Sequence, residues 1–275
     1  MGHFGASLVA DARTAGVCFT GSVAGGRAVV AATAAGFATS GLELGGKDPA
    51  YVRPDADFSF AVEQLVDGAF FNSGQCCCGI ERVYVHEAIH DRFVEAFADL
   101  TSRYNLGNPL TPETTLGPMA AVRFADTVRA HTSEALARGA QPLIDAKRFP
   151  ADKAGSAYLM PQVLVGVDHG MRVMMEESFG PVVGIMKVAS DEAAVELMND
   201  SPYGLTASVW TGDAEAAERI GDGIATGTVF MNRCDYVDPA LAWTGVKDTG
   251  RGASMSRLGF EALTRPKSFH LRIEH

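Results

Sequence analysis

The order of short β-rich runs and helical stretches constrains the fold of this 275-residue chain more than any other feature. Amphipathic stretches lie between these runs, one over 89–100 and one over 191–198 with Ser190 as a plausible N-cap. The β-rich runs themselves cover residues 16–20, 82–85, 181–188 and 207–210. This alternation predicts an α/β fold.

The composition indicates a soluble globular protein, because 47% of the residues are apolar and 20% are charged. A formal net charge of -10 argues against nucleic acid as a partner, since such proteins concentrate Lys and Arg on a basic face. No apolar run approaches the roughly 18 residues that a membrane crossing needs, and the first residues lack a secretory pattern. We therefore predict no membrane partner and a cytoplasmic location.

Three of the five cysteines are consecutive, at positions 76–78, which favours free thiols in a reducing compartment. Zinc sites usually contain Cys-x-x-Cys pairs, and that spacing is missing, so we predict no metal site. One interpretation treats the three residues as small buried hydrophobic side chains. The other starts from Gly74 and Gln75, whose turn would expose one sulfur and present backbone N–H groups to an oxyanion.

Two acidic motifs each have a structural and a chemical interpretation. Glu43 is either a solvated residue at a helix end or a partly desolvated base with a raised pKa, and the glycines after it form a turn or let a ligand approach. Glu176 and Glu177 precede Phe179 and a Gly-Pro turn. A carboxylate there either accepts hydrogen bonds from ribose hydroxyls or belongs to a charged turn.

Residues 17–27 indicate a strand, a tight loop and a helix start. The N-terminus of such a helix binds anions such as a cofactor phosphate, although a plain strand-to-helix turn has the same pattern. The glycines do not form the G-x-G-x-x-G fingerprint.

Taken in order, five segments closely resemble the aldehyde dehydrogenase superfamily: FTGSVAGG, LELGGKDP, FFNSGQCCCG, EESFGPVVG and GTVFMN. The resemblance runs from about Val17 to the C-terminus. It implies the α/β catalytic domain of that family, a Rossmann-like open sheet with flanking helices, beside a remnant of the cofactor-binding domain. The implied division is residues 1–43 for the remnant, 44–250 for the catalytic domain, and 251–275 for a C-terminal helix, tail and oligomerisation strand.

The resemblance also implies a role for individual residues. Cys77, the last residue of the G-Q-x-C motif, is the expected nucleophile, and Glu43 the expected general base. The expected NAD or NADP contacts are Ser22, Gly21, Gly26, Leu44, Gly45, Glu177 and Phe179. The pocket for a small-molecule aldehyde is expected to contain Phe71, Cys76, Cys78, Asn232, Cys234, Tyr236 and Trp243.

The chain also departs from the family pattern. Residues 1–43 correspond only to the tail of the cofactor domain, so we expect a truncated chain that is weak or inactive alone. The motif P-F-G-G-x-K-x-S-G is altered over residues 242–252. Residues 267–273 alternate like an edge strand, which in the family joins a neighbour's sheet in a homo-oligomer.

Two other functions remain open. A non-catalytic remnant would serve as an assembly or interaction module. A thiol hydrolase using Cys77 would need a positioned histidine, and the nearest in sequence, His86 and His90, fall at a predicted strand end and helix start without a matching motif.

Overall fold

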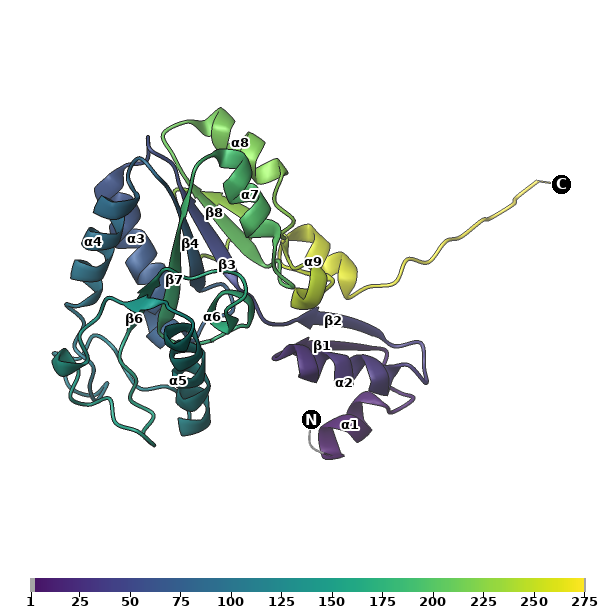
Figure 1. Ribbon diagram of the computed structural model, residues 1–275. Coiled ribbons are helices and arrows are strands. Elements are labelled where there is room, and N and C mark those ends of the chain that lie inside the picture. Colours follow the sequence, from purple (N-terminus) through teal and green to yellow (C-terminus); the bar gives the residue numbers. More distant parts are fainter. Residues whose placement is uncertain (1–2, 275) are drawn as a thin grey trace. The chain divides into compact units, whose positions relative to one another are not determined.

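The computed structural model describes residues 3–274, which form two compact units (Figure 1). The larger unit contains residues 45–236 and 245–249, and the smaller unit contains residues up to 44, 237–244 and those from 250 onward. The N-terminal and C-terminal segments of the chain therefore both belong to the smaller unit.

The larger unit alternates strands and helices along the chain. Its elements are β3 (Asp48–Val52), α3 (Phe58–Phe70), η1 (Phe71–Gly74), β4 (Ile80–His86), α4 (His90–Thr101), α5 (Val122–Ala137), β5 (Gln141–Pro142), η2 (Ala146–Arg148), β6 (Gln162–Val165), α6 (Arg172–Met175), β7 (Val182–Val188), α7 (Asp191–Asn199), β8 (Thr206–Trp210), α8 (Ala214–Asp222), β9 (Thr228–Met231) and η3 (Lys247–Thr249). Side chains cap several helices, since Asp57, Ser190 and Asp213 each accept a hydrogen bond from the first turn of α3, α7 and α8.

Seven strands form one sheet in the order β5-β6-β7-β4-β3-β8-β9. Every pair is parallel except β5 with β6, which is antiparallel. The predicted runs at 82–85, 181–188 and 207–210 correspond to β4, β7 and β8, and the predicted helices at 89–100 and 191–198 correspond to α4 and α7. The α/β prediction is confirmed.

Helices cover both faces of this sheet. Val83 and Val85 of β4 pack with α3 and α4, which lie together on one side in Figure 1. Tyr84, between them in sequence, points into the core formed with α5, α7 and α8. Because both faces are buried, β3 and β8 are buried at every position, as parallel strands in an α/β core usually are.

Three segments of the larger unit meet at the amino edge of its sheet. Residues 45–47 lead into β3, residues 74–79 into β4, and residues 176–181 into β7. β3, β4 and β7 are parallel neighbours, with Asp48 opposite Ile80 and Arg82 opposite Gly184. The topology therefore brings together motifs that are far apart in the chain, such as Gly46 and Glu177, which are 131 positions apart.

The smaller unit contains a three-stranded sheet in the order β1-β2-β11, in which β1 and β2 are parallel and β11 is antiparallel to β2. Val29, Leu42 and Leu44 form its buried centre. Its elements are α1 (His3–Val9), β1 (Gly16–Thr20), α2 (Val23–Thr33), β2 (Thr39–Glu43), β10 (Trp243–Thr244), β11 (Gly250–Arg251), β12 (Ala253–Ser254) and α9 (Ser256–Ala262). The predicted strand at 16–20 is β1.

The segment after α9 forms no strand among the described residues, and its pairing with a second copy stays a prediction. Residues 264–274 carry no strand assignment and are exposed, although 267–273 has the alternation of an edge strand. A strand forms by backbone pairing with a neighbouring strand, and residues 264–274 pair with no strand of the described residues.

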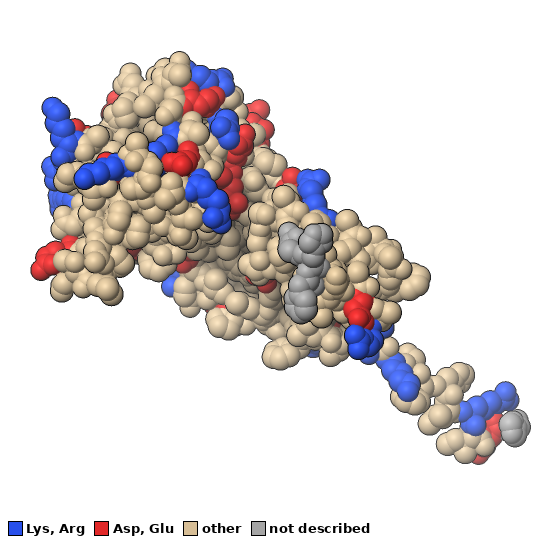
Figure 2. All heavy atoms as spheres, turned by 90° about the horizontal axis from the view of Figure 1, so that it is seen from below, with Lys and Arg blue, Asp and Glu red and all other residues tan. Residues whose placement is uncertain are grey.

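The surface and the helices bear on the class of protein. On the face shown in Figure 2, Lys and Arg side chains lie among Asp and Glu side chains on a largely uncharged background. None of the helices within residues 3–274 has both the length and the apolar character of a membrane-crossing segment.

Candidate active site

The chain reverses sharply just before the three cysteines. Asn72, Ser73 and Gly74 have φ values of 50°, 58° and 70°, which place three successive residues in the left-handed region. A Cβ on Gly74 would lie 2.4 Å from the carbonyl oxygen of Gly180. Only glycine fits this position without displacing the loop that enters β7.

Side-chain hydrogen bonds hold this turn in place. The Gln75 amide donates to the Asn72 carbonyl at 3.0 Å and accepts from the Ala120 backbone N–H at 2.7 Å. Ser73 Oγ donates to the Gly117 carbonyl at 2.7 Å. The loop that carries the three thiols is therefore held by hydrogen bonds within residues 72–75 and to residues 117 and 120.

The three thiols have different surroundings. Cys76 Sγ and Cys78 Sγ each lie 3.0 Å from Oδ1 of Asp235 and can donate to it. Cys77 is half-buried, and hydrogen bonds from the Cys76 and Cys78 thiols lower its pKa because they favour the thiolate, against burial, which raises it. Each flanking thiol has one proton to donate, so Asp235 and Cys77 compete for it.

Gly46 joins the thiol loop to the loop before β7. A Cβ at Gly46 would lie 2.0 Å from the backbone carbonyl oxygen of Cys77, so the two segments touch through main-chain atoms. The Gly46 N–H donates to Glu177 Oε1 at 2.9 Å. A Cβ on Gly45 would lie 2.4 Å from Glu177 Oε2. The paired glycines therefore allow the Cys77 backbone and the Glu177 carboxylate to approach this segment closely, whereas the approach of a ligand stays a prediction.

Glu177 and Phe179 lie on the loop that leads into β7. Burial, with the nearby charge of Glu81, raises the pKa of Glu177 to about 7. Phe179 has a φ of 47° and keeps 39% of its surface exposed. A bulky residue held in the left-handed region is unusual, and here the surrounding hydrogen bonds impose the conformation.

Those hydrogen bonds come from a buried ion pair that sequence reasoning missed. Lys47 Nζ bonds the carboxylate of Glu81, and both side chains are almost fully buried. The same carboxylate accepts the backbone N–H of Ser178 at 2.8 Å and that of Phe179 at 2.9 Å. Burial lowers the pKa of Lys47. Glu81 therefore holds the backbone on which Glu177 and Phe179 are presented.

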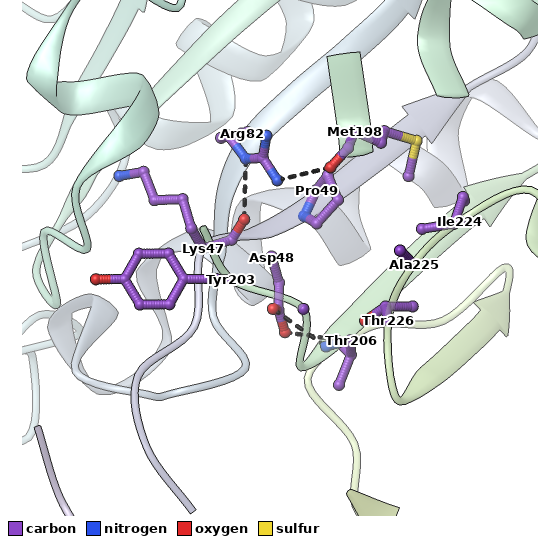
Figure 3. A pocket seen from close by; sticks show the side chains of 11 residues that line it. Lys47, Asp48, Pro49, Arg82, Met198, Tyr203, Thr206, Ile224, Ala225 and Thr226 are labelled. Carbon is purple, nitrogen blue, oxygen red and sulfur yellow. Dashed lines mark hydrogen bonds between the residues drawn. The ribbon is translucent and has the colours of Figure 1, made fainter. Parts of the chain in front are cut away.

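A second polar cluster secures the start of β3 (Figure 3). The Arg82 guanidinium donates to the carbonyls of Lys47 at 2.9 Å and Met198 at 3.2 Å. Asp48 accepts from the hydroxyl of Thr206 at 2.6 Å, and burial raises the pKa of Asp48. These buried bonds lock residues 47–48 between the sheet and α7, so the amino edge is a rigid platform.

Four of the expected pocket residues have different surroundings in the structure. The Asn232 amide is used internally, since it donates to Thr211 O at 2.8 Å and accepts from Thr211 N at 3.0 Å. Cys234 packs against α3 near Gly68, and burial raises its pKa to about 12. Tyr236 and Phe71 are exposed, with the Arg233 guanidinium 3.3 Å above the Tyr236 ring.

The remaining expected site residues lie in the smaller unit. Ser22 caps α2 by accepting the Gly25 N–H at 3.2 Å, Gly21 N donates to the Glu43 carbonyl at 3.0 Å, and Gly26 packs against Leu44. Trp243 is buried in β10, which pairs with β12.

Glu43 is the last residue of β2, so the helix-end interpretation of this residue is wrong. Its half-buried carboxylate accepts a hydrogen bond from Ser254 Oγ. The main chain after Glu43 then leaves the β2 strand for the Gly45–Gly46 segment of the larger unit.

Comparison with known proteins decides the family. The model of the aldehyde dehydrogenase family matches residues 2–269. The chain belongs to the aldehyde dehydrogenase family. It is 38% identical to an aldehyde dehydrogenase of Paenarthrobacter nicotinovorans over 95% of this chain and 56% of that protein. It is 36% identical to the NAD(P)+ succinate semialdehyde dehydrogenase of Escherichia coli K12, over 92% and 54% of the two chains.

Solved structures of aldehyde dehydrogenases have the same fold as this chain. The crystal structure of betaine aldehyde dehydrogenase from Staphylococcus aureus in complex with NAD+ superimposes with a TM-score of 0.88 and 31% identity, covering 94% of this chain and 51% of that one. The predicted catalytic-domain fold of the aldehyde dehydrogenases is thereby confirmed. The chain spans about half the length of the relatives it matches.

Sequence reasoning overlooked three residues that contact the candidate site or hold its loops in place. Asp235 contacts Cys76 and Cys78 from a segment about 160 positions away, and no pattern marks it. Glu81 and Lys47 stand beside recognised motifs, and their signal was a pair of opposite charges next to otherwise apolar strands. The resemblance alone did not distinguish them from surface charges.

Proposed function

We propose that the protein to which this chain belongs oxidises an aldehyde to a carboxylic acid with NAD or NADP, through Cys77. The observation that carries the proposal is the half-buried Cys77 thiol, whose pKa is lowered and whose backbone rests on Gly46 beside Glu177. A thiolate of this kind is an effective nucleophile toward a carbonyl carbon. Relatives named for succinate semialdehyde and betaine aldehyde support the reaction class.

The residues present fit a nicotinamide dinucleotide. A carboxylate accepts up to about four hydrogen bonds, and Gly46 supplies one of those at Glu177, so ribose hydroxyls can bind there. The exposed ring of Phe179 offers an apolar surface for the nicotinamide. In the smaller unit, Ser22 and the N-terminus of α2, with Gly21 and Gly26, suit the pyrophosphate. Leu44 and Gly45 are further proposed cofactor contacts.

Cys77 begins the reaction. Its thiolate forms a bond to the aldehyde carbon, and the carbonyl oxygen becomes an oxyanion that accepts a hydrogen bond from the Cys77 backbone N–H. The bound cofactor supplies a hydride acceptor. Loss of the hydride from the former aldehyde carbon leaves an acyl group joined to Cys77 as a thioester.

Glu43 completes the reaction in this proposal. Its carboxylate takes a proton from water, and the resulting hydroxide attacks the thioester, which releases the carboxylic acid and restores the Cys77 thiolate. The hydrogen bond from Ser254 orients the Glu43 side chain.

Substrate choice and assembly complete the proposal. Phe71, Cys76, Cys78, Asn232, Cys234, Tyr236 and Trp243 are assigned to the aldehyde pocket. Free cysteines suit a cytoplasmic enzyme, and the exposed alternating tail suits a homo-oligomer in which residues 267–273 join a second copy. In this proposal residues 1–43 belong to the cofactor-binding domain, residues 44–250 form the catalytic domain, and residues 251–275 form the C-terminal helix, tail and oligomerisation strand.

The test follows the formation of reduced cofactor and the state of the enzyme thiol together. The 275-residue chain is incubated with an aldehyde panel and NAD+ or NADP+, and NAD(P)H fluorescence and the mass of the Cys77 peptide are recorded. We expect slow NAD(P)H formation with an acyl adduct on Cys77, and loss of both in Cys77→Ser but not in Cys18→Ser. Equal rates in Cys77→Ser and the unmodified chain would contradict the mechanism.

The rate itself tests the expectation that this chain is weak alone. The 275 residues span about half the length of the relatives they match, so we propose that these residues alone turn over more slowly than a full-length relative. Turnover at the rate of full-length relatives would therefore contradict that part of the proposal. Saturable NAD binding together with Cys77-dependent aldehyde oxidation would favour the enzyme, and the absence of both would favour the assembly module.

A further inference from the structure

Two thiols and a carboxylate converge beside the nucleophile. Cys76 Sγ and Cys78 Sγ are 3.5 Å apart, and each lies 3.0 Å from Asp235 Oδ1. Among the described residues, this is the one group of three or more potential metal ligands whose donor atoms all lie within 4.8 Å of one another. Cys78 is buried, while Cys76 and Asp235 are half-buried. The cluster is thus enclosed on one side and reachable from the other.

The fold builds this arrangement from two distant segments. Cys76 and Cys78 are two residues apart, and a Gly79 N–H bond to the Cys76 carbonyl closes the turn that directs both sulfurs to one side. Asp235 has a φ of 47°, a left-handed conformation that aspartate tolerates better than most residues. Next to it, Cys234 packs on Gly68 of α3 and fixes the segment. The carboxylate is therefore held at the thiols by the core.

The geometry is close to that of a tetrahedral ion. Zinc bonds thiolate sulfur at about 2.3 Å and carboxylate oxygen at about 2.0–2.2 Å, which separates two sulfurs by about 3.8 Å and sulfur from oxygen by about 3.5 Å. The three donor atoms of the cluster need to move apart by only about 0.3–0.5 Å to reach those separations. Two thiolates with one carboxylate are also donors that zinc accepts, and three protein ligands leave a fourth position open.

We propose that Cys76, Cys78 and Asp235 form a binding site for a thiophilic divalent cation such as Zn²⁺, next to Cys77. The spacing of the cysteines alone contains no Cys-x-x-Cys pair, and it is Asp235 that supplies the third ligand. Binding replaces the two thiol protons, which pass to solvent, with two sulfur–metal bonds and one oxygen–metal bond. No electron is transferred, and the site does not depend on the proposed aldehyde oxidation.

Cation binding and the thiol hydrogen bonds exclude one another. A coordinated thiolate has no proton, so Cys76 and Cys78 can no longer donate to Cys77 or to Asp235. The cluster therefore has two states, one with thiol donors and one with bound metal. The cation acts as a reversible regulator of the thiol loop.

Cobalt titration provides a direct test. Reduced, tag-free protein in a Cys18→Ser background is titrated with Co²⁺, whose thiolate complexes absorb in the near ultraviolet, and Zn²⁺ is then added to displace it. We expect saturation at one equivalent, proton release in a weakly buffered solution, and retention of the signal in Cys77→Ser. Asp235→Asn should bind at least about tenfold more weakly.

Matched variants distinguish the proposed ligands from chance capture by a thiol. Cys78→Ser removes a buried ligand, so its fold is checked by circular dichroism, and Asp235→Asn provides a second, nearly isosteric ligand variant. Loss of the cobalt signal in Cys77→Ser would identify the nucleophile as the ligand and overturn the proposal. Unchanged affinity in Asp235→Asn, or no saturable absorption in the unmodified cluster, would overturn it as well.

Discussion

The chemistry of a single cysteine depends here on residues that surround its backbone as much as on its side chain. Cys77 lies between two thiols, and its carbonyl rests on Gly46. The Gly46 N–H in turn binds Glu177, so the thiol loop and the acidic loop are joined through a residue without a side chain. Small changes at Gly46 should therefore affect both loops.

Replacing Gly46 with alanine tests this connection. The new Cβ would lie 2.0 Å from the Cys77 carbonyl oxygen, so one segment must move, and overpacking of this kind costs about 1–3 kcal/mol. Urea unfolding measures the change in the free energy of unfolding. Gly117→Ala is the matched control, because a Cβ there meets nothing within 4 Å. Equal stability of the two variants would show that the Gly46 contact is dispensable.

Glu177 should make the stability of the fold depend on pH. Burial raises its pKa from 4.5 to about 7, so between these values the folded state keeps a proton that the unfolded chain has lost. The contribution of Glu177 is therefore complete below about pH 4.5 and is lost as the pH rises through about 7.

Glu177→Gln mimics the protonated form at every pH. We expect it to match the unmodified chain near pH 4.5 and to exceed it by up to about 3 kcal/mol at pH 8. Thermal unfolding of both proteins across this range gives the difference. A difference that does not change with pH would rule out a raised pKa at Glu177.

At the scale of elements, the loop entering β7 owes its conformation to the start of β4. Glu81 accepts two backbone N–H groups of that loop while it pairs with Lys47. In Glu81→Gln the Lys47 charge loses its partner in a buried position, which costs about 3–5 kcal/mol. The exposed Glu63→Gln should change stability by less than about 0.5 kcal/mol.

A double variant separates charge from shape in the Glu81 experiment. Lys47→Met with Glu81→Gln removes both charges and should recover part of the lost stability, because no unpaired charge remains buried. If the double variant is as unstable as the sum of the two single variants, the two side chains do not act as a pair.

The elements themselves could be predicted from local patterns, whereas the contacts between them could not. Periodicity located α4 and α7, and Ser190 marked the start of α7, because these signals lie within a few residues. Cys77 and Glu177 were found through the resemblance. The role of Asp235 depends on how the chain after β9 crosses α3, which no local pattern encodes. Glu81 likewise required the parallel pairing of β3 and β4.

At the scale of the whole molecule, the exposed tail is the feature most suited to assembly. Phe269, Leu271 and Ile273 alternate and are 73%, 79% and 93% exposed, so one side of the extended segment is apolar. Truncation after Arg265 should change the free energy of unfolding by less than about 0.5 kcal/mol, since residues 266–274 are exposed. If the tail forms the interface, sedimentation velocity should show that the unmodified chain self-associates and that the truncated chain does not.

Point variants refine the test of the tail. Leu271→Ser with Ile273→Ser should weaken association as truncation does, whereas His270→Ser, on the opposite side of the extended segment, should not. Association that survives truncation would place the interface elsewhere.

The proposed chemistry requires Cys77 to be an accessible thiol whose pKa lies below that of an ordinary cysteine, about 8.5. The most direct measurement is the rate of iodoacetamide labelling at Cys77 as a function of pH, followed by peptide mass spectrometry. We expect rapid labelling with a midpoint well below pH 8.5. Labelling with a midpoint at or above pH 8.5, or labelling that occurs only after the protein unfolds, would contradict it.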